Sequence, residues 1–324
     1  LSKLALRLKF AFYPLLAVAA LGWLGWDWTH GRSLDAAEDS LFDSVVKLRP
    51  VEPKPSGRTV VVEIDECSIE WTRVQGLGGW PWPRSVHADL LDALDRAGVK
   101  AVGVDVMFLD RDPDDPDGDG MLDAVAAGGA GRFLFATSSQ SGDFNEDAAL
   151  RASQAPGAYP LSPGASKPGP PIAILLPYGD AMAKYAASTN FGRSDDSIVR
   201  DVPLRDEVGG WAIPTLPVML AARAQGRAAS TYPAQIRVNW RKHTQLPYVS
   251  AADLLAGEPV CHATGTRQPV LRGAVVLLGY SAAGISDTKP TPLNPAMPGV
   301  EVWAEATEAL LHDSAIWMPP TSFK

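Results

Sequence analysis

The chain has 324 residues, of which 46% are hydrophobic, and it carries a net charge of −8. A chain of this length can bury one large core or two ordinary ones, and an acidic balance without a basic stretch excludes nucleic acid as a partner. Its 28 prolines and 29 glycines indicate many ordered connections and exclude a collagen-like or coiled-coil chain.

The N-terminal segment predicts a membrane anchor. Residues 10–26 (FAFYPLLAVAALGWLGW) carry no charge, and with the leucines before them they reach the roughly 20 residues that span a bilayer as a helix. Basic residues precede this stretch and Asp27 follows it, so the positive-inside rule places the N-terminus in the cytoplasm and the rest outside. We therefore interpret residues 4–28 as a transmembrane signal anchor. The alternative is a signal peptide cleaved near residues 17–20.

The next elements in chain order form a βαβ unit. An amphipathic helix is expected over residues 33–48, and a proline-rich break over residues 50–55 separates it from a buried strand over residues 59–64. A second helix over residues 84–97 and a second strand over residues 101–107 follow. A strand, a helix of more than a dozen residues and a strand predict parallel pairing with a right-handed crossover.

The remainder of the chain continues this alternation. Residues 157–171 form a loop rich in proline, glycine and serine. The sequence therefore predicts an α/β fold with a mostly parallel central sheet flanked by helices. Further strands are expected over residues 132–136, 172–176, 198–203, 235–239 and 274–278, and further helices over residues 215–224 and 300–311.

Candidate site residues follow the expected strands. In an open α/β sheet, ligands bind beyond the carboxyl ends of the strands, where Asp65 and Asp105 are found. If their strands are neighbours, the two carboxylates lie close enough for acid–base work or for holding a cation. The alternative is that each caps a helix or anchors a turn. Ser281, in GYSAAG, misses the G-x-S-x-G spacing and no helix follows it, which argues against a serine hydrolase.

The stretch WPWPR joins the first strand region to the second helix. Its two prolines fix the backbone and push Trp80 and Trp82 into extended geometry. Arg84 falls at the start of the helix, where a cation is unfavourable unless it meets a carboxylate or a ligand, and we expect Asp65 or Asp105 as its partner. Two interpretations remain: a buried Arg–Asp clamp with the tryptophans in the core, or a pocket lined by Trp80, Arg84 and the carboxylates.

An acidic segment, DPDGDGMLD, resembles the first nine positions of a calcium-binding loop. Asp115, Asp117, Asp119 and Asp123 fall at ligand positions, but Ala126 replaces the glutamate of the twelfth position. These carboxylates suit a Ca²⁺ ion that is weakly bound. The alternative is a solvated acidic loop.

The two cysteines, Cys67 and Cys261, fall on the exported side of the expected anchor. A disulfide between them is permitted in an oxidising compartment, and the alternative is two separate buried thiols. Their wide spacing argues against a zinc site, which needs closely paired ligands.

Seven segments carry a family resemblance over residues 33–312. In chain order they are VVVEIDECSI, GGWPWPRSVHADLLDAL, AVGVDVMF, IVRDVPL, VNWR, AVVLLGYSAAGISD and MPGVEVWAEATEALL. With these segments, the chain resembles the type-two CHASE domain, an extracytoplasmic sensor module of bacterial membrane receptors. Chance does not account for the order and the number of the matching segments together.

The resemblance implies an input domain without catalytic activity and without a required cofactor. Such modules lie outside the inner membrane and pass an envelope signal to a cytoplasmic output, such as a cyclase or a kinase. We expect a homo-oligomer or a protein partner in the envelope. The alternative is a non-catalytic structural or adaptor subunit of a membrane or envelope complex, built on the same fold.

The resemblance also gives domain bounds and candidate ligand residues. Residues 1–28 would be the anchor, 29–56 a helix and linker, 57–318 the sensor domain and 319–324 the start of a juxtamembrane segment. Trp303 stands where the family tends to have histidine, which puts a shared ligand in doubt. The candidate pocket residues are Asp65, Trp80, Trp82, Arg84, His87, Asp105, Arg200, Ser281, Asp287 and Glu301.

Overall fold

The computed structural model divides the chain into two compact units. One consists of residues 1–50 and 317–324, and the other of residues 51–316. Within them the structure describes residues 3–30, 35–140, 150–165, 167–192, 196–242, 246–261, 269–285 and 287–316.

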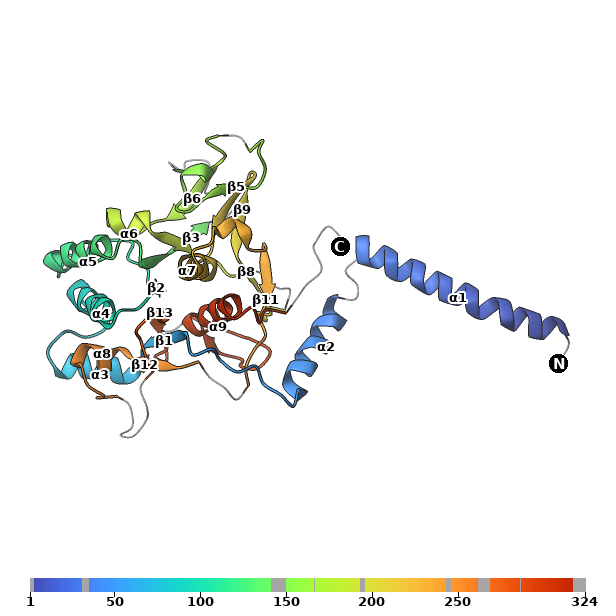
Figure 1. The fold of residues 1–324 in the computed structure, drawn as a ribbon, viewed down its shortest axis with the longest axis horizontal. Coiled ribbons are helices and arrows are strands. Elements are labelled where there is room, and N and C mark those ends of the chain that lie inside the picture. Colours follow the sequence, from blue (N-terminus) through green and yellow to red (C-terminus); the bar gives the residue numbers. More distant parts are fainter. Residues whose placement is uncertain are drawn as a thin grey trace. The chain divides into compact units, whose positions relative to one another are not determined.

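The first unit contains two helices (Figure 1). Helix α1 spans Lys3–His30 and includes Pro14, and helix α2 spans Asp35–Leu48 with two acidic residues in its first turn. The amphipathic helix expected over residues 33–48 is therefore confirmed from residue 35 onward. Within the described part of the chain, no helix is both long enough and apolar enough to cross a membrane. The spanning helix expected over residues 4–28 is thus not shown.

The second unit is built on an eight-stranded central sheet. Its strands pair in parallel, except that β6 pairs antiparallel with both β3 and β4, so the predicted mostly parallel α/β sheet is confirmed. Strand β7 pairs with β3 beside this path. The order is β12 (Tyr248–Ser250), β1 (Thr59–Ile64), β13 (Val275–Tyr280), β2 (Ala101–Val104), β3 (Phe133–Gln140), β6 (Pro171–Leu175) and β4 (Leu150–Arg151), with β7 at Ala186–Ser188.

Helices cover both faces of this sheet, with α4 and α5 on one side and α7 and α9 on the other (Figure 1). The strands read as near-continuous apolar runs because both of their faces are buried. The helix expected over residues 84–97 has those bounds as α4 and ends at Gly98, whose φ of 73° is left-handed. The helices are α3 (Glu66–Val74), α4 (Arg84–Ala97), α5 (Pro116–Gly128), α6 (Asp180–Lys184), α7 (Leu216–Gln225), α8 (Ala251–Ala256) and α9 (Gly299–Leu311), with 3-10 turns at Ala152–Gln154 and Ala229–Thr231.

The core on the α4 side of the sheet is built from residues that the sequence pattern places on one face. Val60 and Val62 of β1 point to the same face of the sheet, where they join a cluster of buried residues that includes Leu90 and Leu94 of α4. On the opposite face, α7 approaches β2 closely at Gly103. A Cβ atom there would lie 2.7 Å from a methyl group of Leu220, so a side chain at this position would force that leucine to shift.

Three small antiparallel sheets lie outside the central one. The strands expected over residues 198–203 and 235–239 form one of them, and the loop expected over residues 157–171 contains a strand of another. These sheets are β5 (Tyr159–Pro160), β10 (Trp211–Pro214) and β9 (Arg205–Val208); β11 (Gln235–Arg237) and β8 (Asp201–Pro203); and β14 (Thr288–Lys289) and β15 (Met297–Pro298).

Candidate functional site

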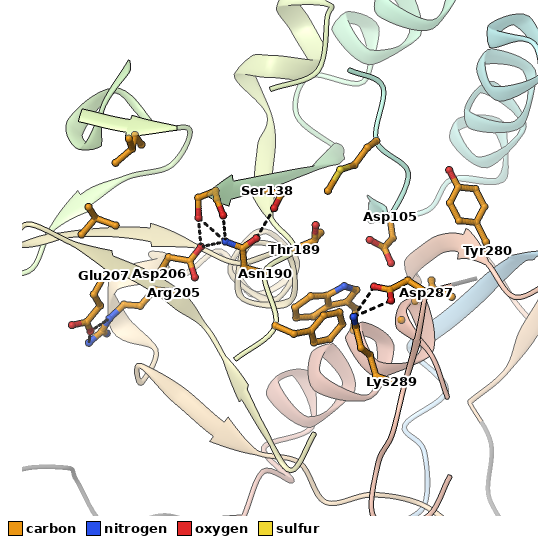
Figure 2. Close-up of a pocket in the computed structure, with 18 of the residues that line it drawn as sticks. Asp105, Ser138, Thr189, Asn190, Arg205, Asp206, Glu207, Tyr280, Asp287 and Lys289 are labelled. Atoms are coloured by element: carbon orange, nitrogen blue, oxygen red, sulfur yellow. Dashed lines mark hydrogen bonds and ion pairs between the residues drawn. The ribbon is translucent and has the colours of Figure 1, made fainter. Parts of the chain in front are cut away.

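A cleft opens where the parallel strands of the central sheet end, and we call it the sheet-edge cleft. Its cavity volume is 980 Å³, and its walls come from the ends of β2, β3, β7 and β13, from β9 and from the first turns of α9. This is the edge at which open α/β sheets bind ligands. Figure 2 labels ten of its polar side chains, which are Asp105, Ser138, Thr189, Asn190, Arg205, Asp206, Glu207, Tyr280, Asp287 and Lys289.

Asp105 follows the last residue of β2 and lies in the cleft between Tyr280 and Asp287 (Figure 2). Its backbone N–H donates to the carbonyl oxygen of Leu278 at 2.7 Å, which keeps the residue in register with β13. Burial and, to a smaller extent, the charge of Asp287 raise the pKa of Asp105 to about 7, while the charge of Lys289 opposes this rise. Within the described part of the chain, the Asp105 carboxylate makes no hydrogen bond or short ion pair.

The expected pairing of Asp65 with Asp105 is wrong, because β13 lies between β1 and β2. Asp65 is instead the N-cap of α3. Its Oδ1 atom accepts hydrogen bonds from the backbone N–H of Ser68 at 2.7 Å and from the hydroxyl of Ser250 at 2.9 Å. For Asp65 the helix-capping alternative is therefore confirmed.

An ion pair and two stacked rings form the wall of the cleft beside Asp105. The Nζ atom of Lys289 lies 2.9 and 2.8 Å from the two carboxylate oxygens of Asp287, and 5.0 Å from the centre of the Phe191 ring. Phe191 stacks on Trp303 with ring centres 4.0 Å apart, and Trp303 is fully buried. The first residue of α9 packs closely against the backbone before β14, because a Cβ atom on Gly299 would lie 3.1 Å from the carbonyl oxygen of Asp287.

A hydrogen-bond network forms the opposite wall. The Oδ2 atom of Asp206 accepts from the hydroxyls of Ser188 at 2.6 Å and Ser139 at 3.2 Å. The amide nitrogen of Asn190 donates to the same oxygen at 3.2 Å, and its amide oxygen accepts from the hydroxyl of Ser138 at 2.8 Å. Burial raises the pKa of Asp206, and these hydrogen bonds oppose that rise. The network fixes the side chains at the ends of β3 and β7 relative to β9.

Beside this network, Arg205 is already paired. Its Nε and Nη2 atoms both lie 2.8 Å from the Oε1 atom of Glu207, two residues along β9. Among the described residues, the cleft thus contains two basic side chains, Arg205 and Lys289, and each forms an ion pair with an acidic residue of the same lining.

Arg84 meets a carboxylate, but not the expected one. Its Nε atom lies 3.7 Å from Oδ1 of Asp119, and its Nη2 atom donates to the carbonyl oxygen of Asp110 at 3.1 Å. The guanidinium also lies 5.0 Å from the centre of the Phe108 ring. The prediction of Asp65 or Asp105 as its partner is therefore wrong, because the acidic segment supplies a nearer carboxylate.

The residues next to Arg84 belong to the core. Trp82 is buried and its indole N–H donates to the hydroxyl of Thr72 at 2.8 Å, whereas Trp80 lies edge-on against Tyr280 with ring centres 4.9 Å apart. His87 is buried, and burial together with Arg84 lowers its pKa to about 3, so the imidazole is neutral. Neither tryptophan lines the sheet-edge cleft. The arrangement favours the clamp over the pocket.

Three other candidates also lie outside this cleft. The hydroxyl of Ser281 donates to Glu63 at 3.1 Å. Glu301 lines a second cavity, of 510 Å³, beside β1. Arg200 forms a bidentate pair with Asp196 at 3.0 and 2.7 Å. Of the predicted pocket residues, the sheet-edge cleft thus brings together Asp105 and Asp287.

The acidic segment forms the beginning of helix α5, so the expected loop is wrong. Asp115 caps the helix by accepting from the N–H of Gly118 at 3.0 Å, and Asp119 accepts from the N–H of Asp112 at 3.0 Å. Asp123 accepts from the N–H of Ala181 at 3.1 Å, whereas Asp117 is exposed. The described residues contain no group of three or more His, Cys, Asp or Glu side chains that could hold a metal ion. Calcium binding stays a prediction.

Cys67 and Cys261 form a disulfide bond, which was one of the two alternatives. Their Cα atoms lie 5.8 Å apart, and the bond closes a loop with a sequence separation of 194 residues. It joins α3 to the segment that follows α8.

Sequence reasoning missed most of the cleft. The polar residues after β3 and β7 carried a signal, because they follow buried apolar stretches at the carboxyl ends of strands. Arg205, Asp206 and Glu207 carried none, because β9 belongs to a separate small sheet.

The fold and the cleft define an α/β domain with a polar binding cleft at its sheet edge, and the comparison of sequences agrees with such a domain. The family model described as CHASE2 domain matches residues 15–324. The chain belongs to this family, whose members are extracellular sensor domains of signalling proteins and are not catalytic. No curated protein and no solved structure matches the chain significantly.

Proposed function

We propose that this chain is the extracytoplasmic sensor of a bacterial transmembrane signalling protein, and that the sheet-edge cleft binds its signal molecule. Residues 4–28 would anchor it in the inner membrane, and a second copy or an envelope protein would be its partner. Support comes from the family and from the cavity of 980 Å³ at the ligand-binding edge of the sheet.

The observation that carries the proposal is the position of helix α9. Its first residues, Gly299 and Val300, line the cleft, and all residues from 302 to 309 are buried. At its other end, Glu308 accepts hydrogen bonds from the N–H of Ser56 at 2.5 Å and from the hydroxyl of Thr59 at 2.6 Å. Ser56 lies six residues after Pro50, where the chain enters the second unit.

The chain leaves the second unit beside the same helix. Ile316 is the last residue of this unit, and it forms an isolated β-bridge with Arg237 five residues after the end of α9. Both connections between the units therefore adjoin the end of α9 that is far from the cleft. The helical rise of about 1.5 Å per residue makes α9 a rod of about 14 Å from Gly299 to Glu308. A ligand that displaces the start of this rod would move both connections.

Hydrogen exchange tests this transmission. The full chain is first screened by thermal shift against anionic, neutral and cationic small molecules, and a compound that stabilises it is studied further. We expect the compound to change amide exchange at residues 52–59. The variant Asn190→Trp, which fills the cleft, should lose both the thermal shift and the exchange change.

A second variant separates transmission from binding. Glu308→Gln weakens the hydrogen bonds to residues 56 and 59, so it should keep the thermal shift and reduce the exchange change. Glu301→Gln is the matched control on the same helix and should keep both effects. A ligand that binds in the cleft without changing exchange at residues 52–59 would contradict the proposal. If no compound binds the cleft, the structural or adaptor function replaces ours.

A further inference from the structure

The charges of the sheet-edge cleft are unbalanced. Among the residues that the structure describes, its lining has four acidic side chains and two basic ones. Arg205 is paired with Glu207, and Lys289 with Asp287, so neither cation is available to balance the remaining acids. The remaining acids are Asp105 and Asp206, and no described cation lies within ion-pair distance of either. The cleft therefore repels an anionic ligand and attracts a cationic one.

The two carboxylates without a cationic partner differ in how many of their oxygens already accept hydrogen bonds. The Oδ2 atom of Asp206 is occupied, because it accepts hydrogen bonds from Ser188, Ser139 and Asn190. Its Oδ1 atom accepts none from the described residues. Both oxygens of Asp105 are likewise without a hydrogen bond in the described part of the chain. A ligand that donates to these oxygens would complete their bonding.

The cleft already holds one ammonium group in the manner that a ligand would require. The Nζ atom of Lys289 lies between the Asp287 carboxylate and the face of Phe191, which is the usual combination of an acid and an aromatic ring around a cation. This arrangement shows that the wall of the cleft tolerates an ammonium group. Because Trp303 covers the other face of Phe191 and is fully buried, the rings offer no open platform for an uncharged sugar.

We propose that the ligand of the sheet-edge cleft is a small organic cation whose ammonium groups bind at Asp105 and at Asp206, on opposite walls of the cleft (Figure 2). This inference rests on the proposed sensor function and names the chemical class of its ligand. Hydroxyl or amide groups of the ligand would contact Ser138 and Asn190 on the wall beside Asp206. Phosphorylated and polycarboxylate ligands are excluded by the same charges.

Binding of a cation should release protons. The groups that face Asp105 are Tyr280 from β13, Asp287 from the residue before β14, and Lys289 from β14. With a pKa of about 7, Asp105 is partly protonated at neutral pH. An ammonium group at this carboxylate favours its charged form, so binding near pH 7 should release up to about half a proton per ligand. A neutral ligand that only accepts hydrogen bonds would not cause this release.

Isothermal titration calorimetry of the full chain tests the inference with three probes on the same four-carbon frame: putrescine, butanediol and succinate. We expect putrescine to bind at least about ten-fold more tightly than the other two, because a charge-assisted hydrogen bond is stronger than a neutral one. The heat of putrescine binding should depend on the ionisation enthalpy of the buffer near pH 7. This dependence should be much weaker at about pH 8, where Asp105 is mostly ionised before binding and putrescine is still a dication.

Matched variants locate the site. Asp105→Asn and Asp206→Asn should each weaken putrescine binding about ten-fold, and Asp105→Asn should also abolish the dependence of the heat on the buffer. Asp92→Asn, on the exposed face of α4, removes an equal charge at a position away from the cleft. It should change neither the affinity for putrescine nor the dependence of the heat on the buffer. A circular-dichroism melt confirms that each variant is folded.

The possible results separate this inference from the sensor function. Succinate or butanediol binding as tightly as putrescine, putrescine binding unchanged by both aspartate variants, or no saturable putrescine binding would overturn the ligand class. If succinate binds and Asn190→Trp abolishes that binding, the cleft is a ligand site of another class and the sensor function stands. If putrescine binds as expected but exchange at residues 52–59 does not change, the ligand class stands and the sensor function fails.

Discussion

Replacing Asp105 with asparagine should make the chain more stable at high pH and change its stability little at low pH. The pKa of this carboxyl rises from its ordinary value of 3.8 to about 7 on folding. Between these values the folded chain binds more protons than the unfolded chain, so stability falls as the pH rises through this window. Each pKa unit corresponds to about 1.4 kcal/mol, which limits the cost of ionising Asp105 to about 4 kcal/mol above pH 7.

Asparagine has nearly the same shape and stays neutral, so it avoids this cost. Guanidinium unfolding of the full chain and of Asp105→Asn, at about pH 4.5 and about pH 8, measures the effect. The free energy of unfolding of the variant, relative to that of the natural chain, should rise by about 3 kcal/mol between the two pH values. Asp92→Asn is the control, because its side chain is 52% exposed. An equal difference in the free energy of unfolding between the variant and the natural chain at both pH values would refute the conclusion that burial raises the pKa of Asp105.

Three further predictions concern stability, and thermal or guanidinium unfolding checks each. Reduction of the Cys67–Cys261 disulfide should destabilise the chain by up to about 5 kcal/mol, because the bond closes a loop of 194 residues; no loss would mean that the unfolded chain is already constrained. Trp82→Phe removes the hydrogen bond to Thr72 and should cost about 1–2 kcal/mol, whereas Trp23→Phe should cost little. Gly103→Ala should cost about 1–3 kcal/mol, because its Cβ atom would clash with Leu220, and an unchanged midpoint would contradict that packing.

Local patterns predicted the framework of the fold. The apolar run of β1, the amphipathic pattern of α4 and the glycine at its end depend on neighbours within a few residues, and all three were predicted with bounds close to those observed. The order of the strands could not be predicted in the same way. β13 comes more than two hundred residues after β1, yet it pairs along the whole of β1 and separates it from β2.

The prediction of a loop for the acidic segment failed for a related reason. Its charges favour a solvated loop when only local repulsion is considered. In the folded chain, Asp115 accepts from the N–H of Ser85, Asp119 lies beside Arg84, and Asp123 accepts from the start of α6. These partners lie 30 or more residues away in sequence for Asp115 and Asp123, so the segment becomes helical through contacts that no local window contains.

The residues of the cleft could likewise be predicted only in part from local sequence. Asp105 and Asp287 could be proposed from strand ends and from a family resemblance. Asp206 could not, because its place opposite Asp105 depends on a small sheet that packs beside the ends of β3 and β7.

The disulfide also affects the folding of the chain, before any signal molecule binds. Disulfides form in the compartment outside the cytoplasm, where this family is found. In a domain of this family, the bond between α3 and the segment after α8 would therefore form only after export. Until then the loop of 194 residues stays open, and the chain lacks the stabilisation that the bond supplies. The stability of the second unit thus depends on the redox state of the compartment in which it folds.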